Sequence, residues 1–294
     1  MNRLLVTGGS GYLGSHLIEA AAACAWDVRA TYHSRPFASA LPLDLRRPDA
    51  VLALIRDTRP TAIIHTACSN GSADQIRAIV PAARHLASAA REFDARLIHV
   101  STDLVFDGEH APYFDDSPPA PIAGYGRSKA EAEALVTALC PGAVVVRPSL
   151  IWGLEPLDRQ TGWLVDGVRC GERVTLFADE IRCPVHVHDL CAALLELATR
   201  PDLSGTMNLG GPQPLNRWDF GMRLLAALRL APGPNVGRST IQESGLLRAR
   251  DLTMRSTRAA QFLEIRLRSV DEVLDLSPVS ASPERQRCPR YCEG

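Results

Sequence analysis

The chain has 294 residues, 46% of them hydrophobic, which is enough to bury one large core or two joined lobes. Its formal net charge of −1 argues against nucleic acid as a partner, because domains that bind nucleic acid are as a rule basic. No run approaches the roughly 20 apolar residues that span a bilayer, and the first residues lead into a predicted strand without a signal peptide. We therefore expect a cytoplasmic protein that binds neither nucleic acid nor a membrane.

The eight cysteines stand mostly in apolar segments without regular spacing, so we expect reduced, buried side chains and no disulfide framework. Cys288 and Cys292 form a C-x3-C pair, but no second pair lies nearby to complete the four ligands that zinc usually takes. The sequence therefore predicts no metal site.

Strand-like and helix-like segments alternate through the first half of the chain. The predicted strands are 3–7, 27–33, 41–43, 61–66, 96–101 and 143–147, and the predicted helices are 12–24, 48–58, 73–93 and 123–139. This alternation predicts an α/β fold with a doubly wound parallel sheet of the Rossmann type, connected by right-handed crossovers. We predict that residues 1–148 form an NAD(P)-binding domain, with ligands at the carboxyl ends of the strands.

Beyond Pro148 the pattern loosens. Short strands are predicted at 173–177, 184–187 and 206–209, and helices at 162–170, 190–199 and 216–228. Asp189 is the expected N-cap of the helix that follows it, and His186 and His188 are expected to face opposite sides of a strand. Residues 149–270 are predicted to form a smaller α/β substrate-binding lobe, from which strands can return to the main sheet, and residues 271–294 a tail.

A glycine-rich loop follows the first predicted strand and opens the first helix. Gly8, Gly11 and Gly14 form a G-x-x-G-x-x-G pattern, which allows a tight turn, close approach to a pyrophosphate and close packing of helix on strand. The helix N-terminus adds unpaired N–H groups and a partial positive charge. We predict a dinucleotide-binding loop whose contacts include Ser10, Tyr12 and Leu13.

The end of the second strand bears on the choice between NAD and NADP. NAD sites usually place an acidic residue there to bind the ribose 2′-hydroxyl. This chain has His33, Ser34 and Arg35 instead, and Arg35 with Ser34 suits a 2′-phosphate. We therefore predict NADP as the preferred cofactor, with NAD as the other choice, and an exposed loop arginine as the alternative interpretation.

Two further strand ends are expected to contribute to the cofactor site. Asp44, followed by Leu45, can accept a hydrogen bond from the adenine amino group, although a turn or capping role is an equal alternative. His65, Thr66 and Ala67 end the fourth strand and are expected near the cofactor ribose. A histidine satisfied within the core is the alternative for His65.

Tyr125 and Lys129 are four residues apart in a predicted helix and so share one face. A tyrosine ordinarily has a pKa near 10, and a nearby ammonium lowers it, so the phenol can exchange a proton with a carbonyl oxygen. Thr102 or Ser101, at the end of the fifth strand, can bond the developing alkoxide. Together with the glycine loop, this set predicts hydride and proton transfer at a carbinol carbon.

These motifs resemble the extended short-chain dehydrogenase/reductase family over roughly residues 1–263, closest to the dTDP-4-dehydrorhamnose reductases. The stretches that carry the resemblance are 101–108, 125–129, 147–153 and 177–190. The resemblance implies an NADPH- or NADH-dependent reductase of a 4-keto deoxysugar on a nucleoside diphosphate, working as a homodimer. Thr102, Tyr125 and Lys129 would be its catalytic triad and Ser101 their neighbour.

The resemblance also implies where the sugar nucleotide binds. Asp103, Val105, Trp152 and Arg182 match the substrate side, with Arg182 either reaching a substrate phosphate or lying on the surface. Two departures stand out. His65-Thr66-Ala67 replaces the family's Asn-Ala-Ala, and Ile79 stands where the family has an asparagine that supports the lysine.

Two other functions stay open. A nucleotide-sugar epimerase or dehydratase would retain NAD, yet the carboxylate that favours retention is missing and Asp103 supplies one carboxylate where dehydratases usually have two. A relative of this branch is a regulatory subunit of methionine adenosyltransferase that binds NADP without obvious turnover. A non-catalytic NADP-binding regulatory subunit is therefore the third hypothesis.

Overall fold

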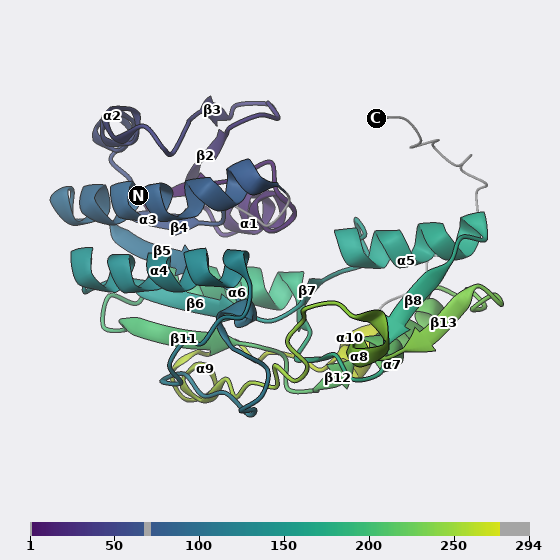
Figure 1. Cartoon of the computed structure of the whole chain (residues 1–294). Helices are drawn as coiled ribbons and strands as arrows, with labels where there is room; N and C mark the ends of the chain where they lie inside the picture. Colours follow the sequence, from purple (N-terminus) through teal and green to yellow (C-terminus); the bar gives the residue numbers. More distant parts are fainter. Residues whose placement is uncertain (1, 68–71, 277–294) are drawn as a thin grey trace.

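Seven parallel strands form the central sheet of the computed structural model, which describes residues 2–67 and 72–276 (Figure 1). The strand order is β11-β6-β5-β4-β1-β2-β3, and every neighbouring pair is parallel. The strands are β1 (Arg3–Thr7), β2 (Asp27–Tyr32), β3 (Leu41–Pro42), β4 (Ala62–His65), β5 (Arg96–Val100), β6 (Val144–Pro148) and β11 (Gly205–Leu209). The predicted doubly wound fold is confirmed.

Helices cover both faces of this sheet (Figure 1). On one face α2 (Pro48–Thr58), α3 (Ala73–Glu92) and α4 (Gly124–Leu139) bury one hydrophobic cluster, and on the other α1 (Tyr12–Ala23), α6 (Val187–Ala198) and α9 (Thr257–Phe262) bury a second. Because both faces are covered, the strands are runs of apolar residues without alternation, as in Val144-Val145-Val146. The crossovers bring the carboxyl ends of β1, β4 and β5 to one edge, where the candidate residues gather.

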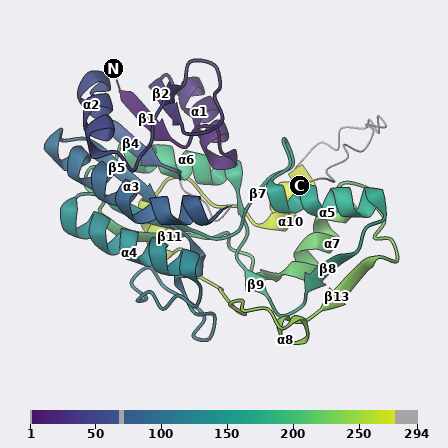
Figure 2. The same ribbon diagram turned by 45° about the horizontal axis from the view of Figure 1, so that its top comes forward.

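The smaller lobe lies beside the sheet (Figure 2). Its helices are α5 (Arg159–Cys170), α7 (Arg217–Ala227), α8 (Ile241–Ser244) and α10 (Val270–Leu276). Its strands are β7 (Ile151–Trp152), β8 (Val174–Phe177), β9 (Ile181–Arg182), β10 (Val185–His186), β12 (Leu215–Asn216) and β13 (Val236–Ser239), and they pair two by two. Two hydrophobic clusters, around Trp152 and Leu164, hold these short elements together.

The second half of the chain contributes to both lobes. β11 pairs with β6 along the whole of both strands, and α6 packs against the main sheet. The division at residue 148 therefore stays a prediction, since the main sheet includes residues beyond it. Residues 271–276, placed in the tail from the sequence, belong to α10, and residues 277–294 lie outside the described residues. In the described part of the chain, no helix is both long and apolar enough to span a bilayer.

Two local predictions in the second half were wrong. The helix α6 begins at Val187 with His186 as its N-cap, so Asp189 lies in the first turn, where its carboxylate accepts hydrogen bonds from Arg268. His186 and His188 do not face opposite sides. Because the backbone turns from strand into helix between them, their rings lie 5.0 Å apart, edge to face.

Candidate functional site

The glycine loop joins β1 to α1 in the shape that a phosphate-binding turn needs. Gly8 has φ +79°, and a Cβ placed on it would lie 2.7 Å from the Cα of Ala67 at the end of β4. A Cβ on Gly14 would collide with the carbonyl oxygen of Gly8, so only glycine lets α1 start this close to the strand. Gly11 is the N-cap of α1 and supplies no side-chain cap. The first N–H groups of α1 are therefore not capped by a side chain and suit an anion.

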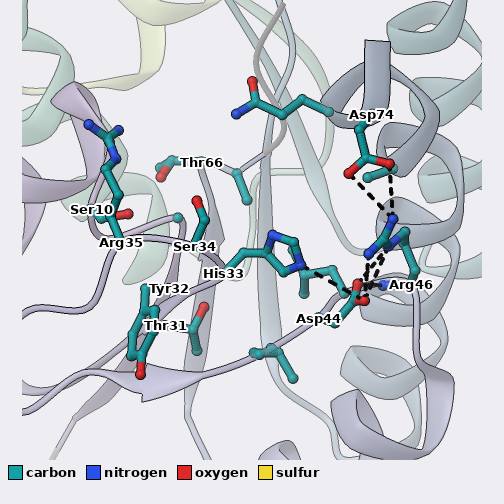
Figure 3. Close-up of a pocket in the computed structure, with 17 residues that line it drawn as sticks. Ser10, Thr31, Tyr32, His33, Ser34, Arg35, Asp44, Arg46, Thr66 and Asp74 are labelled. Carbon is teal, nitrogen blue, oxygen red and sulfur yellow. Dashed lines mark hydrogen bonds and ion pairs between the residues drawn. The ribbon is translucent and has the colours of Figure 1, made fainter. Parts of the chain in front are cut away.

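A cavity opens at this loop, between the ends of β1, β2 and β4 (Figure 3). We call it the cofactor pocket. It is lined by Gly8, Ser10, Gly11, Thr31, Tyr32, His33, Ser34, Arg35, Leu43, Asp44, Leu45, Arg46, Thr66, Ala67, Asp74, Gln75 and Ala78. Ten of these were cofactor-binding candidates from the sequence. The glycine loop and this cavity together fit the pyrophosphate and the adenosine half of a dinucleotide.

The two sides of the cofactor pocket differ in charge. Arg35 extends on the side of Ser10, with Ser34 beside it, whereas Asp44, Arg46 and Asp74 gather on the opposite side (Figure 3). Arg35 is exposed and makes no ion pair within the described residues. One side thus offers a guanidinium and two hydroxyl groups to an anion.

On the acidic side, Arg46 holds two carboxylates. It donates to both oxygens of Asp44, with Nη2 2.8 Å from Oδ2, and its Nη1 lies 3.1 Å from Oδ1 of Asp74. The hydrogen bonds from Arg46 lower the pKa of Asp44 to about 2, so this side chain is an acceptor at neutral pH. Sequence reasoning missed Arg46 and Asp74. The D-x-R spacing after the third strand was the available signal for Arg46.

Of the three candidates at the end of β4, His65 lies in the core, whereas Thr66 and Ala67 line the cofactor pocket. His65 is buried, its Nδ1 lies 2.7 Å from the hydroxyl of Thr7, and it does not line the cofactor pocket. The alternative of a core histidine is therefore the better description of His65. Burial, and then the charge of Lys129, lower its pKa to about 3. Thr66 and Ala67 do line the cofactor pocket, and the hydroxyl of Thr66 donates to the carbonyl oxygen of Thr7.

The Tyr-Lys helix lies against the end of β5. A Cβ on Gly126 would collide with the carbonyl oxygen of Leu104, so α4 rests directly on the 3₁₀ turn η1 (Asp103–Val105). Lys129 is buried, and its Nζ donates to the carbonyl oxygen of Val100 at 3.0 Å. Tyr125, one turn earlier, is half-buried on the same helix. The structure thus brings the helix that carries both residues to the strand end that carries Thr102.

Lys129 is the only lysine among the chain's 32 lysine and arginine residues. An arginine could not replace it easily at this point, because a planar guanidinium needs more room and more acceptors than a compact ammonium. The burial of this ammonium at the carboxyl end of a strand is costly, which is typical of a functional group and not of a surface charge.

The hydroxyls of Ser101 and Thr102 have different partners. Ser101 donates to Glu133, which also binds Arg147 through three hydrogen bonds, the shortest 2.6 Å from Nη2 to Oε2. This buried group ties α4 to β5 and β6 and occupies the hydroxyl of Ser101. The hydroxyl of Thr102 accepts from the N–H of Leu104 and lies 3.3 Å from Oδ1 of Asp103. Of the two, Thr102 is the candidate that we retain for binding a substrate oxygen.

A buried chain of charges runs from Thr102 into the smaller lobe. Asp103 accepts from the hydroxyl of Ser149 at 2.8 Å and lies 3.7 Å from Nη1 of Arg182. Nη2 of Arg182 lies 3.1 Å from Oε1 of Glu180, and Arg248 binds the other oxygen of that carboxylate. Arg182 is therefore not a surface residue, and Asp103 and Arg182 are linked to each other.

Four other candidates belong to the core. Val105 is fully buried against Phe106, and Trp152 is buried with its ring edge-on to His186 and Phe220. The side chain of Leu13 packs in the sheet's core. The hydroxyl of Tyr12 is buried, has no hydrogen-bond partner within the described residues, and has a raised pKa because of burial and of Asp158. Direct substrate contacts by Val105 and Trp152 stay a prediction.

A parallel doubly wound sheet with a glycine-loop pocket at its carboxyl edge and a second lobe beside it defines a Rossmann-type α/β protein. The chain belongs to the family described as the RmlD substrate binding domain, whose family model matches residues 1–275. The predicted resemblance to dTDP-4-dehydrorhamnose reductase-like proteins is confirmed.

Similar proteins include a subunit of methionine adenosyltransferase and a probable ketoreductase. Methionine adenosyltransferase 2 subunit beta of Xenopus laevis is 31% identical over 242 residues, which cover 78% of this chain and 72% of that protein. A probable dTDP-4,6-dihydroxy-2-methyloxan-3-one 4-ketoreductase of Streptomyces antibioticus is 29% identical over 245 residues, or 79% of each chain.

Solved structures show the same fold. The dTDP-4-dehydrorhamnose reductase of Bacillus anthracis, in complex with NADP, has a TM-score of 0.82 at 24% identity, covering 94% of this chain and 98% of that one. A hypothetical dTDP-4-dehydrorhamnose reductase of Sulfolobus tokodaii has a TM-score of 0.81 at 26% identity, covering 93% and 98%.

Proposed function

We propose that the protein is an NAD(P)H-dependent reductase of a keto group on a nucleotide-linked deoxysugar. The observation that carries the proposal is the buried Lys129 at the end of β5, one turn from Tyr125 and on the same sheet edge as the glycine loop. Two relatives described as reductases or ketoreductases of such sugars support it. A cytoplasmic homodimer remains part of the proposal.

The proposed chemistry divides between cofactor and protein. The nicotinamide cofactor, when bound, supplies the hydride. Tyr125 donates the proton to the carbonyl oxygen of the substrate, and the ammonium of Lys129 stabilises the phenolate that remains. The hydroxyl of Thr102 donates a hydrogen bond to the same oxygen as negative charge develops on it. In the reverse direction the phenolate takes the proton back.

NADP is the cofactor that we propose as preferred. Residues 32–35, at the end of β2, include no carboxylate to bind a ribose 2′-hydroxyl. Arg35 makes no ion pair within the described residues and lines the cofactor pocket together with Ser34 and Ser10. The Bacillus anthracis relative is described in complex with NADP, although other structural neighbours are in complex with NAD. The absence of that carboxylate also weighs against an epimerase or dehydratase with retained NAD.

The test is NADPH oxidation with a dTDP-4-keto-6-deoxysugar. We expect steady turnover by the wild type and a loss of about 10²–10⁴-fold in kcat for Tyr125→Phe, because that substitution removes the proton donor alone. NADPH binding, followed by its fluorescence, should stay within a few-fold. Turnover that survives in Tyr125→Phe would contradict the mechanism, and NAD recovered from the protein as purified would favour the epimerase or dehydratase.

A non-catalytic NADP-binding regulatory subunit is the second candidate. The 31% identity to a methionine adenosyltransferase regulatory subunit favours it, and so does Ile79, which is buried in the core where the reductase family has its lysine-supporting asparagine. The test is saturation with NADPH followed by addition of a panel of keto-sugar nucleotides. Binding without any consumption of NADPH would favour the regulatory role over the reductase.

A further inference from the structure

The elements α5, α7 and β8 come together in the smaller lobe (Figure 2). Residues of all three line a second cavity. We call it the arginine pocket. It is lined by Arg159, Gln160, Trp163, Thr175, Leu176, Phe177, Glu180, Arg217 and Arg248. Three guanidinium groups face a single carboxylate, so the lining carries an excess of positive charge. Such a lining favours an anion that enters from solvent.

Arg217 leaves part of its guanidinium unsatisfied in this pocket. Its Nη2 donates to Oε1 of Gln160 at 3.0 Å, but its Nη1 is buried and has no hydrogen-bond partner within the described residues. Burial lowers the pKa of Arg217. Guanidinium groups have donors in a fixed fork that matches phosphate oxygens, and an unpaired buried donor is costly. An oxyanion at this point would satisfy it.

Two aromatic rings accompany the arginines. The guanidinium of Arg248 lies over the ring of Phe177, 5.4 Å from its centre, and Trp163 is 46% exposed on α5. A flat ring beside cationic groups suits a ligand that has both a planar base and phosphates. The chemical class that fits is a nucleoside diphosphate, which is the part of the proposed substrate that stays attached to the sugar and takes no part in the reduction.

A series of residues with alternating charge connects the arginine pocket to Thr102. Glu180 is shared by Arg248, which lines the pocket, and by Arg182, which is deeper, each at 3.1 Å. Arg182 in turn lies 3.7 Å from Asp103, whose other oxygen lies 3.3 Å from the hydroxyl of Thr102. Glu180, Arg182 and Asp103 are all buried, so a change in the charge around one of them is felt by the next with little screening.

We propose that Arg217 and Glu180 make turnover depend on a diphosphate in the arginine pocket, through the contacts Glu180–Arg182–Asp103 that end at Thr102. An anion that binds Arg217 and Arg248 weakens the contact of Arg248 with Glu180, so that Glu180 pairs with Arg182 alone. The stronger pair moves Arg182, and with it the carboxylate of Asp103. The inference rests on the proposed function. It means that the diphosphate raises kcat as well as lowering KM, as expected when binding energy remote from the reaction is used to orient the reacting groups.

Binding is tested first and without activity. Inorganic pyrophosphate and dTDP are titrated against the holoenzyme by calorimetry, with wild type, Arg217→Gln, Glu180→Gln and the matched control Arg169→Gln, which changes an exposed arginine of α5 outside the pocket. We expect Arg217→Gln to raise the Kd of both probes about 10–100-fold, as for loss of a charge-assisted contact, and Glu180→Gln to bind them as tightly as the wild type or more so. Equal affinity of Arg217→Gln and wild type would overturn the role of Arg217.

The coupling is tested by the split between kcat and KM. With the dTDP-4-keto sugar, Glu180→Gln is expected to lower kcat at least about 10-fold despite intact pyrophosphate binding. With the free 4-keto sugar, which lacks the nucleoside diphosphate, added pyrophosphate is expected to raise turnover by the wild type and not by Glu180→Gln. A Glu180→Gln variant that changes KM alone would overturn the coupling. Should this buried substitution prevent folding, judged by circular dichroism, Arg248→Gln changes an exposed side chain that lines the pocket and pairs with Glu180. Whatever its affinity for pyrophosphate, this variant must lower kcat at saturating sugar nucleotide, and an effect on KM alone would overturn the coupling.

The two proposals fail in different ways. If the wild type reduces no keto-sugar nucleotide but pyrophosphate binds through Arg217, the proposed function and the coupling to turnover are overturned while anion recognition in the pocket is supported. If keto-sugar nucleotides are reduced but neither probe binds in the arginine pocket, the proposed function stands and this inference is overturned.

Discussion

Two buried histidines should make the folded protein lose stability in mild acid. His65 and His99 lie side by side on β4 and β5, with ring centres 5.1 Å apart, and both are about 1% exposed. Burial lowers the pKa of His65 to about 3 and that of His99 well below its usual value, and the charge of Lys129 contributes to both shifts. Both imidazoles are therefore neutral in the folded protein throughout the physiological range.

The size of the effect follows from the difference between folded and unfolded states. In the unfolded chain an imidazole binds a proton below about pH 6.5, whereas in the folded protein His65 binds one only near pH 3. The free energy of unfolding is therefore unaffected above about pH 6.5 and falls by about 1.4 kcal/mol per histidine for each pH unit below it. At pH 5 the loss is about 2 kcal/mol for each histidine, or about 4 kcal/mol for the pair.

Urea unfolding of wild type, His65→Asn and His99→Asn at pH 7.5 and 5.0 measures this loss. Each single variant should lose about 2 kcal/mol less than the wild type between the two pH values, whatever its stability at pH 7.5. His33→Asn, which changes an exposed histidine, is the control and should keep the wild-type loss. If either variant at His65 or His99 kept the full loss, that imidazole would be protonated in the folded protein at pH 5. The conclusion that burial keeps it neutral would then be wrong.

Three further predictions concern the site. Glu133→Gln should lower the free energy of unfolding by about 3–5 kcal/mol in urea, because it leaves the buried charge of Arg147 unpaired, whereas Glu133→Leu combined with Arg147→Met should recover most of the loss. Arg35→Ala should raise the Kd of NADPH about 10-fold or more in fluorescence titrations and that of NADH less than about 2-fold, because only NADPH has the 2′-phosphate. Lys129→Ala should weaken cofactor binding and turnover together in steady-state assays, because one buried ammonium serves both.

Each of these has an outcome that contradicts it. A loss below about 1 kcal/mol in Glu133→Gln would mean that water reaches the ion pair. Equal effects on NADPH and NADH in Arg35→Ala would remove the argument for NADP. Unchanged kinetics in Lys129→Ala would contradict the assignment of Lys129 to the catalytic site.

The main sheet could be predicted because its signals are local. Strands such as β1 and β4 are short apolar runs, each followed along the chain by a helix. Pro48 at the first turn of α2 and the glycine loop before α1 mark helix starts without any tertiary information. The cofactor pocket followed for the same reason. Its predicted residues come directly after strands, and parallel strands end at one edge of the sheet.

The smaller lobe could not be predicted as well, because its signals are not local. Most of its strands are two residues long and are held by pairings such as Leu215 with Arg182, which no nearby pattern announces. Arg217 and Arg248 come from distant segments and reach one pocket only in the folded chain. Asp189 looked like an N-cap, but its partner Arg268 is 79 residues away. Trp152 is buried against Phe220, a contact between distant segments that no local pattern indicates.

The pairing of β11 with β6 has a practical consequence for dissecting the two lobes. The last strand of the sheet comes from residues 205–209, so a fragment that stops at residue 148 would present β6 as a bare edge, with Val144, Val145 and Val146 flanked by unpaired amides. Exposed apolar edges of this kind recruit further chains and aggregate. Cofactor binding is therefore best studied in the intact polypeptide, and a circularly permuted version would need to keep residues 205–209 within reach of that edge.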